Sequence, residues 1–457
     1  MSHLFTGVDH NVTNFNETQM GEIFGQGIFN VKAYGASGVG QQDDVTAIQY
    51  AIDAAIDVAG IVYFPPGKYR YSSTLNITGK VHVLGGGIPR RWTGTTISPE
   101  LTENSSVILE YTGASIGIKL HNSTASVIWN GTILEGFELR PSVAGAGTDG
   151  IVLDAGVSGE DIAITGVILK NVTTKNWGQD GVHTKGTVFD ITFDNYSAND
   201  NRRYGAYIDN TGAQTGVPSQ ITFRDIWVVP YSASSDSWGV RTVGTDTIRF
   251  FGGTITGYTS AGGGLWLDTG ALLSGTHVEG AITSGTIGVR YTGSNGLILE
   301  GVHIVNWGIG VQIGNPSSKT EVAKGFVISG EISGNTIDLH LVDGGNRQGV
   351  VLHRGYAQTF VVDDDRRTTD TVTNEWFYLG NDAGSIIEFD NGDKISHPET
   401  GSGLTFNANW TISDGTYNGG HLVLGTYHLW VDATGDLRIK DGAPSSGTDG
   451  AVVGGQS

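Results

Sequence analysis

The segment DGIVLD at residues 149–154 returns as DGVHTK at 180–185 and as YGAYID at 204–209. The same glycine-led pattern recurs on both sides of these copies, from IGIKL at residue 116 to IGVQIG at residue 309. Its glycines are Gly117, Gly150, Gly181, Gly205, Gly239, Gly264, Gly288 and Gly310, at spacings of 33, 31, 24, 34, 25, 24 and 22 residues. Repeats of about 20–50 residues are typical of solenoids and propellers.

A second series, of the form apolar-x-apolar-x-Gly-apolar, lies between these copies, as in ITGVIL near Gly166 and LILEGVHIV near Gly301. Each period therefore holds at least two strands with two-residue alternation, which is one turn of a coil of strands. A propeller blade needs about 40 residues and four strands, so these units are too short for one. The pattern predicts an all-β chain folded as a right-handed parallel β-helix.

The repeats are preceded by a helix-like segment. Asp44 is a suitable N-cap, and an apolar face follows it, made of Val45, Ile48, Ile52, Ala55 and Ile56. Residues 61–64 then read as a buried strand. An amphipathic helix at this place can cap the open end of a coil whose interior is apolar.

Three motifs in this region carry a family resemblance: NVKAYGASGVGQQDD at 30–44, VYFPPGKY at 62–69 and VHVLGGG at 81–87. Together with the repeats, over roughly residues 29–355, they resemble the pectate-lyase-like β-helix superfamily, in the version shared with tailed-virus tailspikes. The resemblance implies a right-handed parallel β-helix that is a homotrimer in virions and binds, and often cuts, surface polysaccharide. Because that superfamily contains lyases, hydrolases, deacylating enzymes and adhesins, the motifs predict the fold and leave the reaction open.

We therefore divide the chain into an N-terminal arm (1–28), an N-terminal cap of the coil (29–90), the parallel β-helix (91–356) and a C-terminal small all-β domain with a flexible tail (357–457). In the last part the pattern changes to short alternating strands between Gly, Asn and Asp turns. Its end, YHLWVDATGDLRIKDGAPSSGTDG, is similar to the C-termini of β-helical proteins from halophilic archaea and their viruses.

The composition of the chain excludes several kinds of partner and binding site. The net charge of −20 argues against nucleic acid as a partner and is compatible with a halophilic environment. The chain has no Cys and two Met, so it offers no thiolate or other soft ligand cluster, and we expect neither a cofactor nor a metal site. No apolar run is long enough to cross a bilayer, and residues 1–20 lack the basic and apolar regions of a signal peptide, as expected of a virion protein assembled in the host cytoplasm.

Outward-facing side chains should stack in columns, because side chains alternate along a strand and neighbouring strands lie about 4.8 Å apart. Counting from each repeat glycine, position +2 gives Lys119, Val152, His183, Tyr207, Arg241, Trp266, Arg290, Gln312 and His340. Position +4 gives His121, Asp154, Lys185, Asp209, Val243, Asp268 and Thr292. The first column predicts a glycan groove in which His183, Tyr207, Arg241, Trp266 and Arg290 bind sugar rings and acidic groups. The alternative is the ordinary polar outer face of any solenoid.

The second column offers carboxylates for cleavage. Asp209 and Asp268 are two turns apart, about 9–10 Å at the backbone, near the separation of an inverting glycosidase pair, and Asp154 is a further candidate. An aspartate after a strand can equally serve only to bond the next turn. A lyase would instead need a base and a cation beside a uronate, which His183, Tyr207 and Arg241 could supply from consecutive turns.

We therefore expect a virion tailspike-type receptor-binding protein that binds, and can cleave, host surface glycans. Its expected partners are those glycans, two further copies of itself in a homotrimer, and tail or baseplate proteins, without membrane insertion. A free polysaccharide lyase or glycoside hydrolase is the alternative, and a purely structural virion protein is a third.

Overall fold

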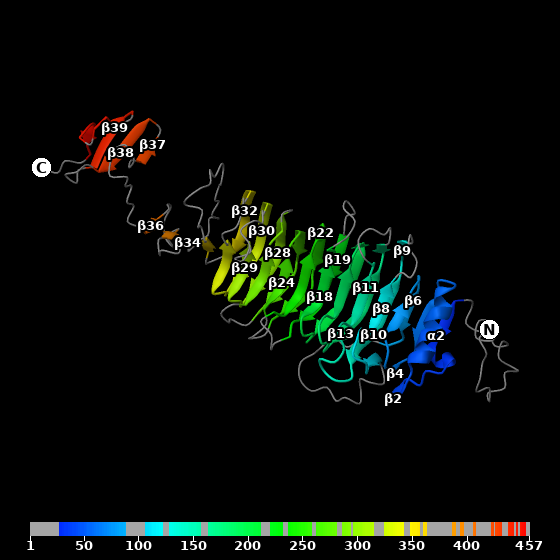
Figure 1. Ribbon diagram of the computed structural model, residues 1–457. Helices are drawn as coiled ribbons and strands as arrows, with labels where there is room; N and C mark the ends of the chain where they lie inside the picture. Colours follow the sequence, from blue (N-terminus) through cyan, green and yellow to red (C-terminus); the bar gives the residue numbers. More distant parts are fainter. Residues whose placement is uncertain are drawn as a thin grey trace, which may run out of the picture.

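A computed structural model of the chain describes residues 27–87, 106–121, 128–156, 163–211, 220–231, 236–257, 262–280, 286–293, 296–314, 324–341 and 348–356, with shorter stretches at 360–362, 386–389, 394–396, 405–407, 422–424, 426–431, 437–442, 445–446 and 448–453. The predicted N-terminal arm falls almost wholly outside the described residues. The described part is a right-handed parallel β-helix with a helix at its N-terminal end, as the repeats predicted (Figure 1).

One face of the coil is a long sheet, here called sheet B, and it contains the strands that carry the repeat glycines. Its parallel strands are β5 (Leu75–Ile77), β8 (Ile118–His121), β11 (Ile151–Asp154), β14 (Val182–Lys185), β18 (Tyr204–Asp209), β21 (Trp238–Val243), β24 (Gly263–Leu267), β27 (Ile287–Tyr291), β29 (Ile309–Ile313), β31 (Ile337–Leu341), β33 (Phe360–Val362) and β34 (Ile386–Phe389), followed by antiparallel β35 (Lys394–Ser396) and β36 (Thr405–Asn407). The parallel ladder thus continues past residue 356, and the domain boundaries stay predictions.

The remaining faces come from sheet A, which consists of two ladders joined by long strands. The first ladder includes β1 (Ile28–Asn30), β3 (Ile61–Phe64), β6 (His82–Gly85), β16 (Ile191–Asp194), β19 (Gln220–Arg224), β22 (Thr247–Phe251) and β25 (Gly270–Ser274). The second includes β2 (Val39–Asp43), β4 (Gly67–Tyr71), β7 (Val107–Tyr111), β17 (Ser197–Asn199), β20 (Trp227–Val229), β23 (Thr254–Thr256) and β26 (His277–Glu279). The long strands are β10 (Ile133–Pro141), β13 (Ile168–Lys175), β28 (Leu297–Val305), β30 (Lys324–Ser333) and β32 (Gln348–Tyr356).

Two small sheets complete the described strands. Parallel β9 (Ile128–Asn130), β12 (Ala163–Thr165) and β15 (Val188–Phe189) form one. Antiparallel β37 (Leu422–Leu424), β38 (Tyr427–Val431), β39 (Leu437–Asp441) and β40 (Ala451–Val452) form the other, in agreement with the small all-β unit predicted for the C-terminal region.

The N-terminal end of the coil is covered by η1 (Val31–Tyr34) and α2 (Val45–Ile56) (Figure 1). Ile48, Ile52 and Ala55 are buried as predicted, and Ala51 is buried with them. Asp44 occupies the N-cap position, but its carboxylate accepts hydrogen bonds from the amides of Ser37 and Gly38. The residue therefore fixes the preceding loop, whereas the Val45 amide donates to Asp43 Oδ1.

The interior of the coil is apolar and stacked rung on rung, a rung being one turn of the coil. Positions +1 and +3 after each repeat glycine are buried as predicted, from Ile118 and Leu120 to Val311 and Ile313. In the first ladder, Phe193, Phe223 and Phe250 stack with ring centroids 4.4 and 4.7 Å apart. Offset stacking adds a directional contact to the burial of these rings, so it also helps to fix the register between rungs.

One physical reason explains why glycine occurs at all eight repeat positions. A Cβ on any of the eight would lie 2.5–2.7 Å from the backbone oxygen of the equivalent residue in the next rung. Real Cβ atoms do not approach backbone oxygens so closely, so a side chain here would push two rungs apart. The glycines are therefore required for rung stacking, while the chain turns at a different column, where Asn195, Asp225 and Gly275 adopt positive φ.

Replacing Gly239 with Ala tests whether the repeat glycines are required for rung stacking. Its Cβ would lie 2.6 Å from the Gly264 oxygen and 3.0 Å from Ile255 Cγ2, so we expect a loss of about 1–3 kcal/mol in the free energy of unfolding, measured by urea denaturation. The matched control is Gly275→Asn, since nothing lies within 4 Å of its Cβ and equivalent turns hold Asn195 and Asp225. Equal losses in the two variants would contradict the explanation.

Candidate functional site

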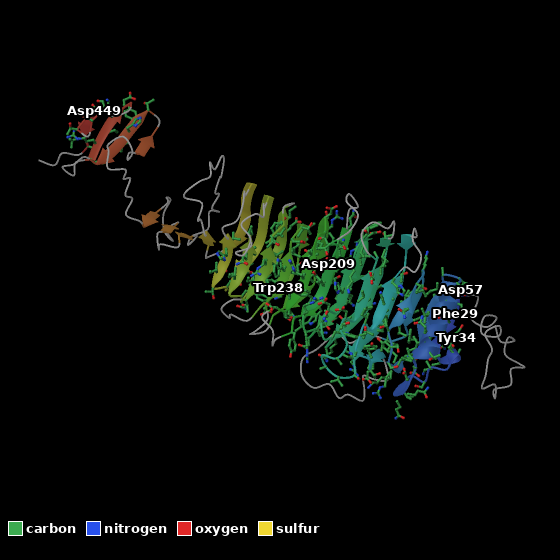
Figure 2. The ribbon with its side chains drawn as sticks, viewed as in Figure 1. Phe29, Tyr34, Asp57, Asp209, Trp238 and Asp449 are labelled. Atoms are coloured by element: carbon green, nitrogen blue, oxygen red, sulfur yellow. The ribbon has the colours of Figure 1, made fainter. Side chains whose placement is uncertain are left out.

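The column predicted at position +2 exists as one continuous register on sheet B. Adjacent strands pair Lys119 with Val152, Val152 with His183, and so on through Tyr207, Arg241, Trp266, Arg290 and Gln312 to His340. The +4 column is also in register from His121 through Asp154 and Lys185 to Asp209 and Val243. Figure 2 shows Asp209 and Trp238 on the central strands of the coil.

The strict alternation of side chains between the interior and the outer face fails at the repeat glycine. As a result, the residue before each glycine joins the outer face. A Cβ on Gly205 would face the interior side chains of Val228 and Ala198, although position +1, Ala206, is also buried. Two consecutive positions therefore face inward, and the residue before the glycine faces outward together with position +2. Tyr204 accordingly contacts Tyr207, with ring centroids 5.0 Å apart.

Around His183, the third member of the column, lies the acid–histidine cluster, which we define as Asp149, Asp180, His183 and Arg203. His183 Nδ1 lies 3.4 Å from Asp180 Oδ2 and 3.6 Å from Asp149 Oδ2, and all three side chains are buried. Arg203 donates to both oxygens of Asp180, through Nε at 2.8 Å and through Nη2. The two aspartates are also linked, because the Asp180 amide donates to Asp149 Oδ1 at 3.1 Å.

The environment separates the two carboxylates in acidity. Burial raises the pKa of Asp180 to about 6, even though the Arg203 guanidinium opposes the shift. Burial alone would also raise the pKa of Asp149, but hydrogen bonding and charge from His183, with the Asp180 amide, lower it below its ordinary value. Pairs of neighbouring acids with divergent pKa values are common in functional sites and also occur in structural ion-pair networks.

Tyr207 covers this cluster on the outside. Its ring centroid lies 4.7 Å from that of His183, and the Arg203 guanidinium carbon lies 5.0 Å from it. Both ring nitrogens of His183 are shielded from solvent, and the carboxylates of Asp180 and Asp149 lie near its Nδ1. Burial, assisted by the charge of Asp209, raises the pKa of Tyr207 to about 12, so its phenol stays protonated at neutral pH.

The next rungs carry the Trp–Arg cluster, which we define as Trp238, Arg241, Trp266 and Arg290. The guanidinium carbon of Arg241 lies 3.6 Å from the ring centroid of Trp266, and that of Arg290 lies 4.8 Å from it. Burial, with the nearby charge of Arg241, lowers the pKa of Arg290 to about 10. Flat rings stacked with forked donors can hold sugar faces and acidic groups together.

The carboxylates predicted to cleave accept hydrogen bonds from neighbouring backbone and hydroxyl groups, Asp209 within its own turn and Asp268 from the preceding rung. Asp209 Oδ1 accepts from the Thr211 amide at 2.9 Å, while Asp268 accepts from Thr242 Oγ1 and from the Gly244 amide, both at 2.9 Å. Burial raises the pKa of Asp268. These bonds favour the structural alternative for both residues, and no contact between them brings an acid and a base together among the described residues.

Asp154 is likewise engaged, by the Lys119 ammonium at 2.9 Å and the Gly156 amide at 3.0 Å. Burial alone would raise its pKa, yet these two partners lower it below its ordinary value. All three predicted acids are therefore bonded to local partners. The predicted binding residues, in contrast, lie next to one another along the +2 column.

The acid–histidine cluster could also hold a metal ion, since one ligand atom each from Asp149, Asp180 and His183 lie within 4.8 Å of one another. The lack of cysteine excludes only thiolate sites, so it does not exclude a site made of carboxylate and imidazole ligands. Both oxygens of Asp180 are, however, engaged by Arg203. A cation would have to replace that guanidinium, so we describe the cluster as an ion-pair network.

Sequence reasoning missed Asp149, Asp180 and Tyr204, and it placed Arg203 and Trp238 only as the last residues of two long turns, 197–203 and 230–238, that could border the groove. Four of these have a signal in the chain, since Asp149, Asp180, Tyr204 and Trp238 each directly precede a repeat glycine. Strict alternation from positions +1 and +3 would place that position in the interior. Arg203 lies in the turn before β18, and the length of that turn was its one signal in the sequence.

Comparison with known proteins agrees with this architecture. Residues 28–246 match the family model described as rhamnogalacturonase A/epimerase, pectate lyase-like. Residues 393–455 match a second family model, described as capsule depolymerase, which covers the antiparallel β37–β40 sheet.

Curated relatives of the chain share only a short segment with it. The chain is 45% identical over 74 residues to mannuronan C5-epimerase AlgE3 of Azotobacter vinelandii, which is 14% of this chain and 4% of that protein. It is 44% identical over 68 residues to alginate lyase 7 of the same organism, which is 13% of this chain and 8% of that protein. The chain thus matches less than a tenth of the length of either relative.

Among solved structures, Geobacillus virus E2 ORF18 aligns with 92% of this chain and 87% of its own, at 15% identity and a TM-score of 0.42. In the described part of the chain, no helix combines the length and apolar character required to cross a membrane.

The ion pair between Asp180 and Arg203 makes the free energy of unfolding depend on pH. The folded-state pKa of Asp180, about 6, exceeds its ordinary value of 3.8, so its stabilising contribution is complete below about pH 4 and is lost as pH rises through 6. Arg203→Gln removes the opposing cation and raises this pKa further. We expect unfolding free energy to fall by roughly 1–3 kcal/mol at pH 8, and by less at pH 5, in urea denaturation.

Lys170→Gln is the control for the Arg203 variant, because it breaks the more exposed pair with Glu135 and should change the free energy of unfolding little at either pH value. An Arg203→Gln loss that is the same at pH 5 and pH 8 would show that Asp180 does not titrate in this range.

Proposed function

We propose that the chain is a tailspike-type polysaccharide depolymerase that binds an acidic glycan along the outer face of sheet B and cleaves it by β-elimination. The observation that carries this proposal is the stacking of His183, Tyr207 and Arg241 in three consecutive rungs, with the His183 and Tyr207 rings 4.7 Å apart. The capsule depolymerase match at residues 393–455 supports a polysaccharide as substrate.

The substrate class follows from charge. The chain carries a net charge of −20, yet this face gathers Arg203, Arg241 and Arg290 around aromatic rings. Guanidinium groups favour carboxylates because two donors match two acceptor oxygens. A polymer of uronic acids would therefore be selected by this face, and the two curated relatives are named for mannuronan and alginate.

The proposed reaction needs a base, an acid and a cation. His183 takes the proton from C5 of the uronate, since the carboxylates beside Nδ1 favour a proton on that nitrogen and leave Nε2 as the basic atom. The C4–O bond then breaks as a C4=C5 double bond forms, and Tyr207 donates its proton to the leaving oxygen. Arg241 neutralises the uronate carboxylate. Because Tyr207 covers His183, its ring turns aside when the sugar binds.

Tyr207→Phe should lower the initial rate of formation of the unsaturated product from sodium alginate by at least about 100-fold, followed by its ultraviolet absorbance. The substitution removes the proton donor and keeps the ring that packs on His183.

Trp266→Ala, in contrast, should weaken alginate binding about tenfold and retain cleavage at saturating substrate, because its ring contacts sugar away from the reacting bond.

Hydrolysis by Asp209 and Asp268 is the rival mechanism and has a different signature. It yields new reducing ends without a double bond, and Asp209→Asn would abolish it. Loss of activity in Asp209→Asn, with full activity in Tyr207→Phe, would overturn elimination. Glycan binding without any product, for the native chain on alginate and other uronate polymers, would support an adhesin instead.

We further propose that the protein acts as a homotrimer on the tail of a virus, attached through tail or baseplate proteins. The β-helix architecture and the resemblance of its N-terminal motifs to tailspikes support this assignment. Light scattering coupled to size-exclusion chromatography should give three times the chain mass of 48.2 kDa. A monodisperse monomer would favour the free lyase or hydrolase.

A further inference from the structure

Two histidines face each other on sheet A, whereas both clusters described above belong to sheet B. His277 on β26 is the register partner of His303 on β28, one rung away. Their Nδ1 atoms lie 2.7 Å apart and their ring centroids 4.7 Å apart. Their side chains are 32% and 43% exposed, so the space between them is open to ions from solution.

The other nitrogen of each ring is held by a carboxylate. His277 Nε2 lies 3.1 Å from Glu279 Oε2, and His303 Nε2 lies 3.2 Å from Glu331 Oε2. Glu331 is oriented in turn, because Ser333 Oγ donates to its Oε1 at 2.7 Å. A carboxylate at Nε2 favours a proton on that nitrogen, which leaves the lone pair of each ring on Nδ1.

Two lone pairs at 2.7 Å repel each other unless a cation lies between them. A single proton can do this, and so can a metal ion. The carboxylate–histidine–metal arrangement is the usual one in metal sites, where the outer carboxylate fixes the ring and makes the ligating nitrogen more basic. Here two such pairs converge from neighbouring rungs.

We propose that His277 and His303 bind one divalent transition-metal ion of the Zn²⁺ type through their Nδ1 atoms. Zn–N bonds of about 2.0–2.1 Å at a tetrahedral angle place two nitrogens roughly 3.3 Å apart, so the rings need to separate by only about 0.6 Å. Glu279 and Glu331 supply two negative charges that offset those of the ion. Imidazole ligands suit Zn²⁺, Ni²⁺ and Cu²⁺, and water fills the remaining positions.

The test is calorimetric titration of ZnCl₂ into the full chain after treatment with EDTA and dialysis. We expect one Zn²⁺ per chain, with affinity weakened at least tenfold in His277→Ala and in His303→Ala. Glu279→Gln should weaken binding by about tenfold, since it removes only the outer carboxylate. Circular dichroism confirms that each variant keeps its fold, which the surface position of these side chains favours.

His82→Ala is the matched control, because His82 forms a histidine–glutamate pair with Glu135 on the same sheet, at 3.2 Å, and its loss should leave Zn²⁺ binding unchanged. The proposal is overturned if the native chain binds no Zn²⁺. It is also overturned if both His277→Ala and His303→Ala bind as the native chain does, which would place the ion elsewhere. Nitrogen-15 NMR that shows a proton shared by the two rings and unaffected by Zn²⁺ would equally reject it.

Discussion

The close approach of consecutive rungs at the repeat glycines is the constraint on which the rest of the structure depends. At each of these positions a backbone oxygen occupies the space where a Cβ would be. A side chain at any of these eight positions would push neighbouring rungs apart, whereas with glycine there the strands of sheet B keep an unbroken register from β8 to β31. Every column of side chains on the outer face follows from this register.

Register also explains why the site is concentrated. Residues 183, 207 and 241 are distant in sequence but adjacent in space, because each occupies the same position relative to its glycine. Aromatic rings and guanidinium groups then stack in alternation along the column, from Tyr207 through Arg241 and Trp266 to Arg290. Such stacking spreads cationic charge over flat surfaces in a protein whose overall charge is strongly negative.

The repeats were sufficient to predict the fold and the members of the +2 column, because glycine spacing and alternation are properties of the chain itself. The capping helix was predicted separately, from the apolar face that follows Asp44. The site was predicted only in part. The residues directly before the glycines were left out of the outer columns, because strict alternation would place them in the interior and nothing in the sequence shows that two consecutive positions face inward at the glycine. The partners of Asp209 and Asp268 come from turns whose geometry the sequence does not specify. The His277–His303 pair was missed because it lies on a different face from the repeat glycines.

The stacked register has a consequence for how such a protein can change its target. The distance between the acid–histidine cluster and the Trp–Arg cluster is set by a whole number of turns, each about 4.8 Å high. Point substitutions can alter the chemistry at either end of this interval but not its length. Matching a polymer with a different monomer repeat would require the gain or loss of an entire turn. The separation of the two clusters can therefore change only in steps of one turn.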